Sequence, residues 1–360
     1  MTTDAVGEVW NFSLELCEGL STRGIEVILA VLGGPLTGAQ VREASQIRGL
    51  RLLPSNYKLE WMPEPWRDVK SAGEWLLDLE AEFTPDVVHL NSYGHVALAW
   101  DAPVILTTHS CVASWWKAVK SGPLPADWGR YVTTVKAALK AADRITAPSL
   151  AMLRTLEENY GLAIDAVSAC VIHNGRLASR FRRSQKEEFV FCAGRLWDAA
   201  KGTDTLAAAA RNLPWPTYLA GDRGEASGRR WTSTGCRLLG KLESEDLARF
   251  YSRASVYAFP ARYEPFGLSV LEAALSGCAL VLGDIPSLRE VWQDNAVFVT
   301  PGDAAALAAA IRRLIASPAL REDLSEKAYR RACQLDRDTM TTAYLDLYSR
   351  AGRERFTCVA

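Results

Sequence analysis

Short apolar runs alternate with helical patterns along the whole chain. In the first half, such runs occupy residues 24–31, 86–90, 103–107 and 144–147, each bounded by turn residues. Short, continuous apolar runs are typical of strands that are buried on both faces of a parallel sheet. The first half therefore predicts an α/β domain.

The second half repeats this pattern. Its apolar runs occupy residues 188–193, 217–220, 237–239, 255–258 and 279–282. The charged stretch at residues 180–188 predicts the linker between the halves. We expect two Rossmann-like α/β domains that face each other across a cleft, with ligands bound at the carboxyl ends of the strands.

The beginning of the chain departs from this pattern. A helical pattern over residues 9–20 leaves only residues 1–5 for a first strand, and these residues are polar and non-periodic. We therefore predict that the first strand of the N-terminal domain is missing. Either the recorded start lies downstream of the true one, or the protein manages without this strand.

The end of the chain predicts one more helix. Met340, Tyr344 and Leu347 recur at helical spacing, which indicates an amphipathic helix that packs on another surface. The predicted organisation is an N-terminal acceptor-side domain, a C-terminal nucleotide-sugar-binding domain, and a final helix that packs back on the N-terminal domain. Their ranges are 1–178, 179–336 and 337–360.

Composition narrows the class of protein. The 360 residues are 49% hydrophobic and 23% charged, which is typical of a soluble globular protein with room for two domains. A net charge of -1 argues against nucleic-acid binding, although a local basic face for peripheral membrane contact is compatible with it. The eight cysteines and four histidines show no metal-binding spacing. No signal region or membrane-spanning apolar run is present, so we expect a cytoplasmic protein.

The most informative candidate chemistry is a turn flanked by Glu264 and Glu272. The backbone amides of Phe266, Gly267 and Leu268 open a helix, where they and the helix dipole favour a phosphate or a polarised sugar oxygen. Eight residues of helix rise about 12 Å, whereas the two carboxylates of a glycoside hydrolase lie about 5 to 9.5 Å apart. The spacing therefore predicts an elongated anionic ligand. Alternatively, Glu264 only complements the helix dipole and Glu272 is an exposed helix charge.

Further motifs accompany this turn in a specific order. They are His173-Asn174-Gly175, Gly194-Arg195-Leu196 with Lys201-Gly202, Leu239-Gly240-Lys241, and Glu264-x7-Glu272. With them, most of the chain resembles the family 4 retaining glycosyltransferases of GT-B fold. The resemblance implies transfer of a hexose from a nucleotide diphosphate sugar to a carbohydrate or lipid-linked acceptor, without a protein nucleophile, an essential metal or another cofactor.

The resemblance also implies roles for individual residues of the second half. Arg195 and Lys201 bind the donor diphosphate, Glu272 holds the ribose hydroxyls, and Glu264 with the amides of Phe266, Gly267 and Leu268 holds the hexose and the adjacent phosphate. Two fixed cations would stabilise a leaving group that gains negative charge in the transition state. Taken alone, Arg195 and Lys201 fit an ordinary solvated pair better, and it is their combination with the Glu264 turn that favours the binding role.

The first half offers fewer candidates. By resemblance, His109 ends a strand near the donor sugar, although a lone histidine is often structural. Gly7 matches a turn that approaches the donor phosphate, but Glu8 stands where a second glycine is common, and its carboxylate would repel a diphosphate. Trp115 and Trp116 suit an acceptor sugar, or they belong to the core.

Three functions follow from these observations. The leading one is a retaining hexosyltransferase. The first alternative is a catalytically inactive GT-B-like subunit that binds a nucleotide sugar or a partner, which Glu8 and the missing strand would support. The second is a nucleotide-sugar epimerase of the same fold, against which the set of Arg195, Lys201 and Glu264-x7-Glu272 argues.

Overall fold

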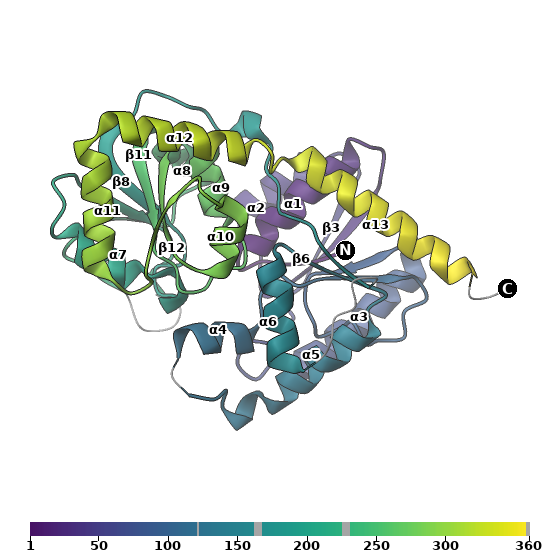
Figure 1. Cartoon of the computed structure of the whole chain (residues 1–360). Coiled ribbons are helices and arrows are strands. Elements are labelled where there is room, and N and C mark those ends of the chain that lie inside the picture. The colour runs from purple at the N-terminus through teal and green to yellow at the C-terminus, as the bar shows by residue number, and fades with distance from the viewer. Residues whose placement is uncertain (121, 162–167, 225–230, 358–360) are drawn as a thin grey trace. The chain divides into compact units, whose positions relative to one another are not determined.

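The chain forms two compact α/β units in the computed structural model, which describes residues 1–120, 122–161, 168–224 and 231–357 (Figure 1). Unit 1 comprises Met1–Lys117, Gly122–Gly175 and Arg337–Ala360, and unit 2 comprises Ala118–Ser121 and Arg176–Asp336. Within the described residues, no helix is long and apolar enough to cross a bilayer.

Unit 1 contains two parallel sheets, ordered β1-β2-β3 and β4-β5-β6-β7. The strands are β1 (Thr2–Asp4), β2 (Val27–Leu32), β3 (Leu50–Pro54), β4 (Val88–Leu90), β5 (Val104–Thr107), β6 (Arg144–Ala147) and β7 (Ala169–Val171). The helices are α1 (Glu8–Ser21), α2 (Gly38–Ser45), α3 (Trp66–Phe83), α4 (Val112–Val119), α5 (Gly129–Ala141), α6 (Leu150–Tyr160) and α13 (Arg337–Thr357). A 3-10 turn, η1 (Ala126–Trp128), precedes α5.

The first strand is present, so the prediction that it is missing is wrong. β1 pairs in parallel with β2, and Thr2 lies opposite Ala30. Thr2 and Thr3 are each 2% exposed, although both are polar. Asn91, directly after β4, donates from its backbone N–H to Thr2 Oγ1 at 3.0 Å and from Nδ2 to the Thr2 carbonyl at 2.7 Å. β-Branched threonines suit a strand, and these hydrogen bonds compensate the burial of Thr2.

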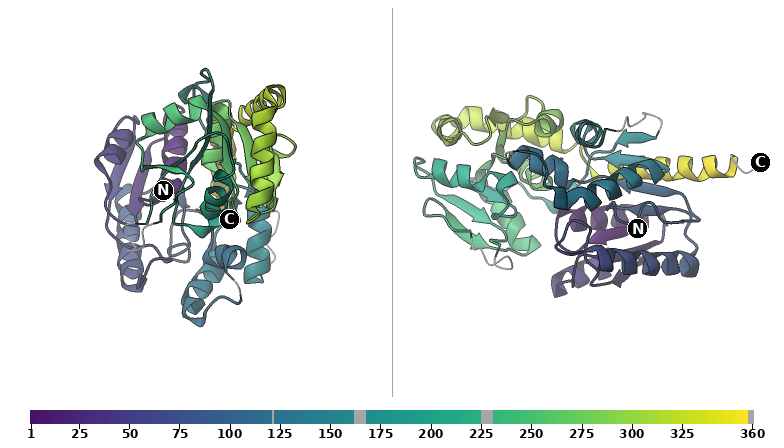
Figure 2. Two further views of the ribbon diagram at one scale, coloured as in Figure 1. Left: turned by 90° about the vertical axis from the view of Figure 1, so that its left-hand side faces the viewer. Right: turned by 90° about the horizontal axis from the view of Figure 1, so that it is seen from below.

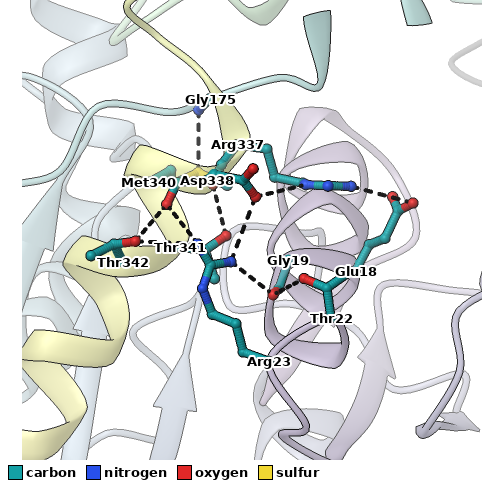
Figure 3. Close-up of polar contacts among 10 residues, drawn as sticks. All are labelled: Glu18, Gly19, Thr22, Arg23, Gly175, Arg337, Asp338, Met340, Thr341 and Thr342. Carbon is teal, nitrogen blue, oxygen red and sulfur yellow. Dashed lines mark hydrogen bonds and ion pairs between the residues drawn. The ribbon is translucent and has the colours of Figure 1, made fainter. Parts of the chain in front are cut away.

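The C-terminal helix α13 packs closely on α1 (Figure 3). Arg337 Nη1 lies 3.3 Å from Glu18 Oε1. Arg23, which follows α1, donates to the Gly19 carbonyl at 3.0 Å and to Thr342 Oγ1 at 3.2 Å. The helices approach each other at Gly19, where an added Cβ would lie 2.1 Å from Thr341 Oγ1. A side chain at position 19 therefore cannot fit without moving α13.

A buried polar network also joins α13 to the sheet. His89 on β4 hydrogen-bonds through Nδ1 to Tyr348 at 2.7 Å and through Nε2 to Thr107 at 2.6 Å. The Tyr344 hydroxyl lies 3.1 Å from Thr107 Oγ1 and 3.3 Å from Thr146 Oγ1. Burial lowers the pKa of His89 well below its usual value and raises the pKa of Tyr344 to about 12. The network therefore holds α13 through neutral groups.

We expect Gly19→Ala to lower the free energy of unfolding by about 1 to 3 kcal/mol, because overpacking displaces α13. Rotating Thr341 brings only partial relief, since its Cβ does not move on rotation and would lie 3.1 Å from the new Cβ. The control is Gly129→Ala at the start of α5, where nothing lies within 4 Å. Urea unfolding should show a lower midpoint for Gly19→Ala only. Equal midpoints in the two variants would contradict this packing.

Unit 2 contains one parallel sheet, ordered β10-β9-β8-β11-β12-β13, with helices on both sides (Figures 1 and 2). The strands are β8 (Glu187–Ala193), β9 (Thr217–Ala220), β10 (Arg237–Gly240), β11 (Ala254–Phe259), β12 (Ala279–Gly283) and β13 (Val297–Val299). The helices are α7 (Thr203–Ala210), α8 (Ser244–Arg253), α9 (Leu268–Leu275), α10 (Pro286–Trp292), α11 (Ala304–Ala316) and α12 (Pro318–Ala332). Two 3-10 turns, η2 (Ala178–Arg180) and η3 (Ala199–Lys201), flank β8.

The central strands of unit 2 are fully enclosed. Every residue of β11 is buried, and the same holds for β12. Burial on both faces explains why these strands are continuous apolar runs rather than alternating ones. The prediction of an α/β protein with two parallel-sheet domains is confirmed.

Candidate functional site

The strand order of unit 2 identifies one edge as the place for a ligand. From β8 the chain builds outward through β9 and β10, and from β11 it builds outward the other way through β12 and β13. The order therefore reverses between β8 and β11, where open α/β sheets bind ligands at the carboxyl ends of the strands. Arg195 and Lys201 follow β8, and Glu264 follows β11.

Backbone contacts hold these two loops against each other. The backbone N–H of Arg262 donates to the Ala200 carbonyl at 2.7 Å, and that of Tyr263 donates to the same oxygen at 3.3 Å. Gly202 has φ +67°, and a Cβ there would lie 2.1 Å from the Pro260 carbonyl oxygen. Only a glycine permits this approach, which places the side chains of both loops in one site.

The centre of the site is an ion pair between Lys201 and Glu264. Lys201 Nζ lies 2.6 Å from Glu264 Oε2, and the residues are 5% and 3% exposed. The Phe266 N–H donates to Glu264 Oε1 at 3.4 Å, and the Ser287 hydroxyl donates to the Glu264 carbonyl at 2.5 Å. The alternative of a solvated lysine is therefore wrong for Lys201. A charge pair withdrawn from water acts strongly on any anion that reaches it.

Arg195 lies at the more open side of this site. Its Nη2 is 3.2 Å from Asp198 Oδ2, and its side chain is 41% exposed. Asp198 is buried, and its other oxygen accepts from the Ala200 N–H at 3.0 Å. Sequence reasoning missed Asp198, although an aspartate before a short helical turn is a recognisable cap. Asp198 thus orients Arg195 and shapes the turn that carries Lys201.

Helix α9 and the turn before it carry the remaining predicted site residues of unit 2. Gly267 caps this helix with φ +89°, while Phe266 and Leu268 on either side are buried. Glu272 is also buried, so the alternative of an exposed helix charge is wrong. Its Oε1 lies 2.9 Å from Arg176 Nη2. Sequence reasoning missed Arg176, whose one signal is its position directly after His173-Asn174-Gly175.

In unit 1, Gly7 and His109 lie at the carboxyl ends of β1 and β5. Gly7 has φ -173° and precedes α1, so this is extended backbone that any residue adopts. Glu8 is the first residue of α1, where the helix dipole stabilises a carboxylate. The two sheets of unit 1 adjoin where Asn91, after β4, bonds to Thr2 on β1, and Gly7 follows β1.

His109 is held by Asn91, another residue that sequence reasoning missed. His109 Nε2 lies 2.8 Å from Asn91 Oδ1, and the ring packs edge-on against Phe12 with centroids 4.5 Å apart. Because Asn91 Nδ2 donates to the Thr2 carbonyl, its oxygen must face the histidine, and Nε2 must carry the proton. Burial lowers the pKa of His109 to about 3, so the ring is neutral.

This geometry predicts that His109 does not protonate between pH 8 and about pH 5, since its pKa lies near 3. The folded pKa is below the unfolded one, so the contribution of His109 to stability is full above about pH 6.5 and declines as pH falls toward 3. Long-range ¹⁵N–¹H NMR spectra should show the Nε2–H tautomer, with His109→Gln to assign the signal. Asn91→Ala should allow tautomer exchange. A ring that titrates near pH 6.5 would contradict the assignment.

The remaining candidates lie on α4. Trp115 and Trp116 are half-buried, with ring centroids 6.5 Å apart, so they are neither core residues nor a fully exposed platform. The neighbouring Lys117 is engaged by Glu158 on α6 at 2.8 Å. Among the residues that the structure describes, no group of His, Cys, Asp and Glu side chains could hold a metal ion.

Comparison with known proteins covers both units. Residues 9–178 match the family described as "Glycosyltransferase Family 4", and residues 177–331 match "Glycosyl transferases group 1". Glycogen synthase of Mycobacterium tuberculosis H37Rv is 30% identical over 304 residues, which is 77% of this chain and 72% of that protein. D-inositol 3-phosphate glycosyltransferase of Kineococcus radiotolerans is 28% identical over 301 residues, or 71% and 68% of the two chains.

Solved structures match over nearly the whole chain. Anabaena HepE in complex with UDP-glucose has a TM-score of 0.76 at 19% identity, and 97% of this chain and 98% of that chain are covered. WaaG, a glycosyltransferase involved in lipopolysaccharide biosynthesis, has a TM-score of 0.72 at 14% identity, with 97% and 99% covered. At these identities the likeness describes the fold.

Proposed function

This chain belongs to the family 4 glycosyltransferases of group 1, with a GT-B fold, and from that premise we propose its reaction. It transfers a hexose from a nucleotide diphosphate sugar to a carbohydrate or lipid-linked acceptor and retains the anomeric configuration. Unit 2 provides most of the donor-binding residues, and unit 1 provides those that bind the acceptor. The predictions of the family and of the fold are confirmed by the comparisons.

The buried pair of Lys201 and Glu264 is the observation that carries this proposal. Breaking the bond between sugar and diphosphate leaves negative charge on the departing phosphate. Lys201 and Arg195 supply positive charge at the carboxyl end of β8, where Lys201 is withdrawn from water and therefore interacts strongly. Glu264 is a hydrogen-bond acceptor for hexose hydroxyls, and the amides at the start of α9 bind the adjacent phosphate.

His109 supports the same reaction from unit 1. Its Nε2–H is engaged by Asn91, so Nδ1 carries the lone pair and accepts a hydrogen bond from a hexose hydroxyl. Because the imidazole is neutral, it adds no positive charge that would compete with Lys201 and Arg195 for the diphosphate. Gly7 leaves room for the donor phosphate at the start of α1, and Trp115 and Trp116 offer aromatic faces to the acceptor.

A donor and acceptor panel tests the reaction. UDP, ADP and GDP are titrated by calorimetry, and their hexose conjugates are incubated with an α-glucan oligosaccharide, inositol 3-phosphate or a polyprenyl phosphate sugar. We expect one nucleotide to bind, its hexose donor to hydrolyse slowly, and one acceptor to accelerate turnover. NMR of the product should show a retained anomeric configuration, and EDTA should leave the rate unchanged.

The same panel separates the competing functions. If no nucleotide binds, the proposal is wrong. Binding without turnover on any acceptor would identify an inactive subunit, which Glu8 at the start of α1 still favours. The presence of β1 removes the other argument for inactivity. Release of an epimerised sugar in place of transfer would identify an epimerase.

A further inference from the structure

Arg176 and Glu272 form a further ion pair of the donor site. Arg176 Nη2 lies 2.9 Å from Glu272 Oε1, and the two side chains are 14% and 8% exposed. Both charges are therefore largely withdrawn from water. The exposed pair of Arg253 and Glu187 on the same unit offers a contrast, because solvent screens such surface pairs.

Both ends of Arg176 are fixed by the surrounding chain. Its backbone N–H donates to the Leu335 carbonyl at 3.2 Å, and it forms a parallel bridge with Asp336. Its guanidinium lies 5.4 Å from the centroid of the Phe181 ring. Glu272 is equally constrained, since it lies on α9, where every residue except Ser269 is buried. The relative position of the two charged groups is therefore set by the fold of unit 2.

We propose that Arg176 is a positioning residue that orients the Glu272 carboxylate toward the ribose hydroxyls of the bound nucleoside diphosphate. This inference rests on the ribose-binding role given to Glu272 by the proposed function. A carboxylate has about four acceptor positions. It can therefore accept from Arg176 through Oε1 and from ribose hydroxyls at the same time.

The charge of Arg176 matters as much as its position. A charge-assisted hydrogen bond from a guanidinium favours the ionised carboxylate, which is a stronger acceptor for hydroxyl groups than the neutral acid. Because Arg176 already holds the Glu272 carboxylate before the donor binds, Glu272 loses less side-chain entropy on binding. Arg176 thus makes the site selective for a ribonucleotide, because a nucleotide without these hydroxyls cannot form the hydrogen bonds to the oriented carboxylate.

The test compares two ligands in four variants. The ligands are the nucleoside diphosphate that binds in the panel above and its 2′,3′-dideoxy form, which lacks both hydroxyls. The variants are Arg176→Gln, Arg176→Lys, Glu272→Gln, and the double variant of Arg176→Gln with Glu272→Gln. Arg253→Gln is the matched control, because it removes an arginine–glutamate pair elsewhere on unit 2. Calorimetry gives Kd for each combination.

We expect the unaltered protein to prefer the ribonucleotide by about tenfold or more. Arg176→Gln should weaken ribonucleotide binding by about tenfold and leave the Kd of the dideoxy form within about twofold. Arg176→Lys should retain part of the preference, since lysine keeps the charge but lacks the planar fork. The double variant should bind no more weakly than Glu272→Gln alone, and Arg253→Gln should behave like the unaltered protein.

Several outcomes would overturn the inference. If Arg176→Gln weakens both ligands equally, Arg176 contacts another part of the nucleotide or only supports the fold. If it tightens ribonucleotide binding, the guanidinium competes with ribose. Should Arg176→Gln fail to fold, an Arg176→Lys variant with the full preference of the unaltered protein would also contradict the fork geometry. If instead Glu272→Gln keeps the full preference, the ribose role of Glu272 in the proposed function fails.

Discussion

Replacing Lys201 by methionine should lower kcat/KM for sugar transfer by about a thousandfold, because it removes the buried cation that stabilises the departing diphosphate. The ammonium lies 2.6 Å from Glu264 Oε2 and both residues are buried, so a hydrated ion from solvent does not replace it at this position. Methionine keeps the apolar stem of lysine and its packing. The measurement is steady-state release of nucleoside diphosphate with the donor and acceptor identified by the panel.

The same variant should also be less stable, by about 3 kcal/mol, because it leaves Glu264 buried without its ammonium partner. Adding Glu264→Gln should restore part of this stability and none of the activity. The comparison of the single and double variants thus separates the loss of a catalytic charge from the loss of a structural pair.

Lys186 provides a matched control. It is a partly buried lysine of unit 2 that donates to the Ser276 carbonyl at 2.7 Å and to the Tyr251 carbonyl at 3.3 Å. It precedes β8, whereas Arg195 and Lys201 follow that strand, so it lies at the opposite edge of the sheet. Lys186→Met should lose stability and keep kcat/KM within about threefold. Equal losses of activity in both lysine variants, or transfer that survives Lys201→Met, would contradict the assignment.

Gly221→Ala should lower the free energy of unfolding by about 3 kcal/mol or more, because a Cβ at this position collides with backbone. The added atom would lie 1.7 Å from the Gly194 carbonyl oxygen and 2.8 Å from its carbon. Gly221 also donates to the Gly240 carbonyl at 2.7 Å, and Gly194 donates to the Ala220 carbonyl at 3.0 Å. The ends of β8, β9 and β10 would therefore be forced apart.

The backbone displacement caused by the added Cβ should also alter the donor site. Gly194 immediately precedes Arg195, so displacing its backbone moves the guanidinium away from the diphosphate position. We expect weaker binding of the nucleoside diphosphate in the fraction of Gly221→Ala that folds, measured by calorimetry.

Gly240→Ala separates the collision from backbone strain. Gly240 has φ +73°, but nothing lies within 4 Å of an added Cβ. The free energy of unfolding of this variant should therefore fall only by the cost of a left-handed backbone conformation, about 1 to 2 kcal/mol. Urea unfolding of both variants, compared at equal m-values, measures the difference. If the two midpoints coincide, backbone strain alone explains the effect and the close approach of β8 and β9 is wrong.

Most strands could be predicted from the sequence, because a strand that is buried on both faces consists of consecutive apolar residues. Strands such as β11 and β12 are enclosed on both faces, so they are continuous apolar runs. β1 could not be predicted from apolar residues, because its buried positions are the polar residues Thr2 and Thr3, and Thr2 is hydrogen-bonded to Asn91. Hydrophobic pattern alone does not report a strand that is stabilised in this way.

The family, the two α/β domains and the segments that carry Lys201, Glu264 and Glu272 could all be predicted from the order of residues. Which side chains meet became known from the folded structure alone. Lys201 pairs with Glu264, Arg176 with Glu272, and Asn91 with His109. Each pair joins residues from separate parts of the chain, and their distance depends on strand order and, for Lys201 and Glu264, on the close backbone approach at Gly202. These are properties of the folded sheet, because no local pattern of residues encodes which strand ends become neighbours.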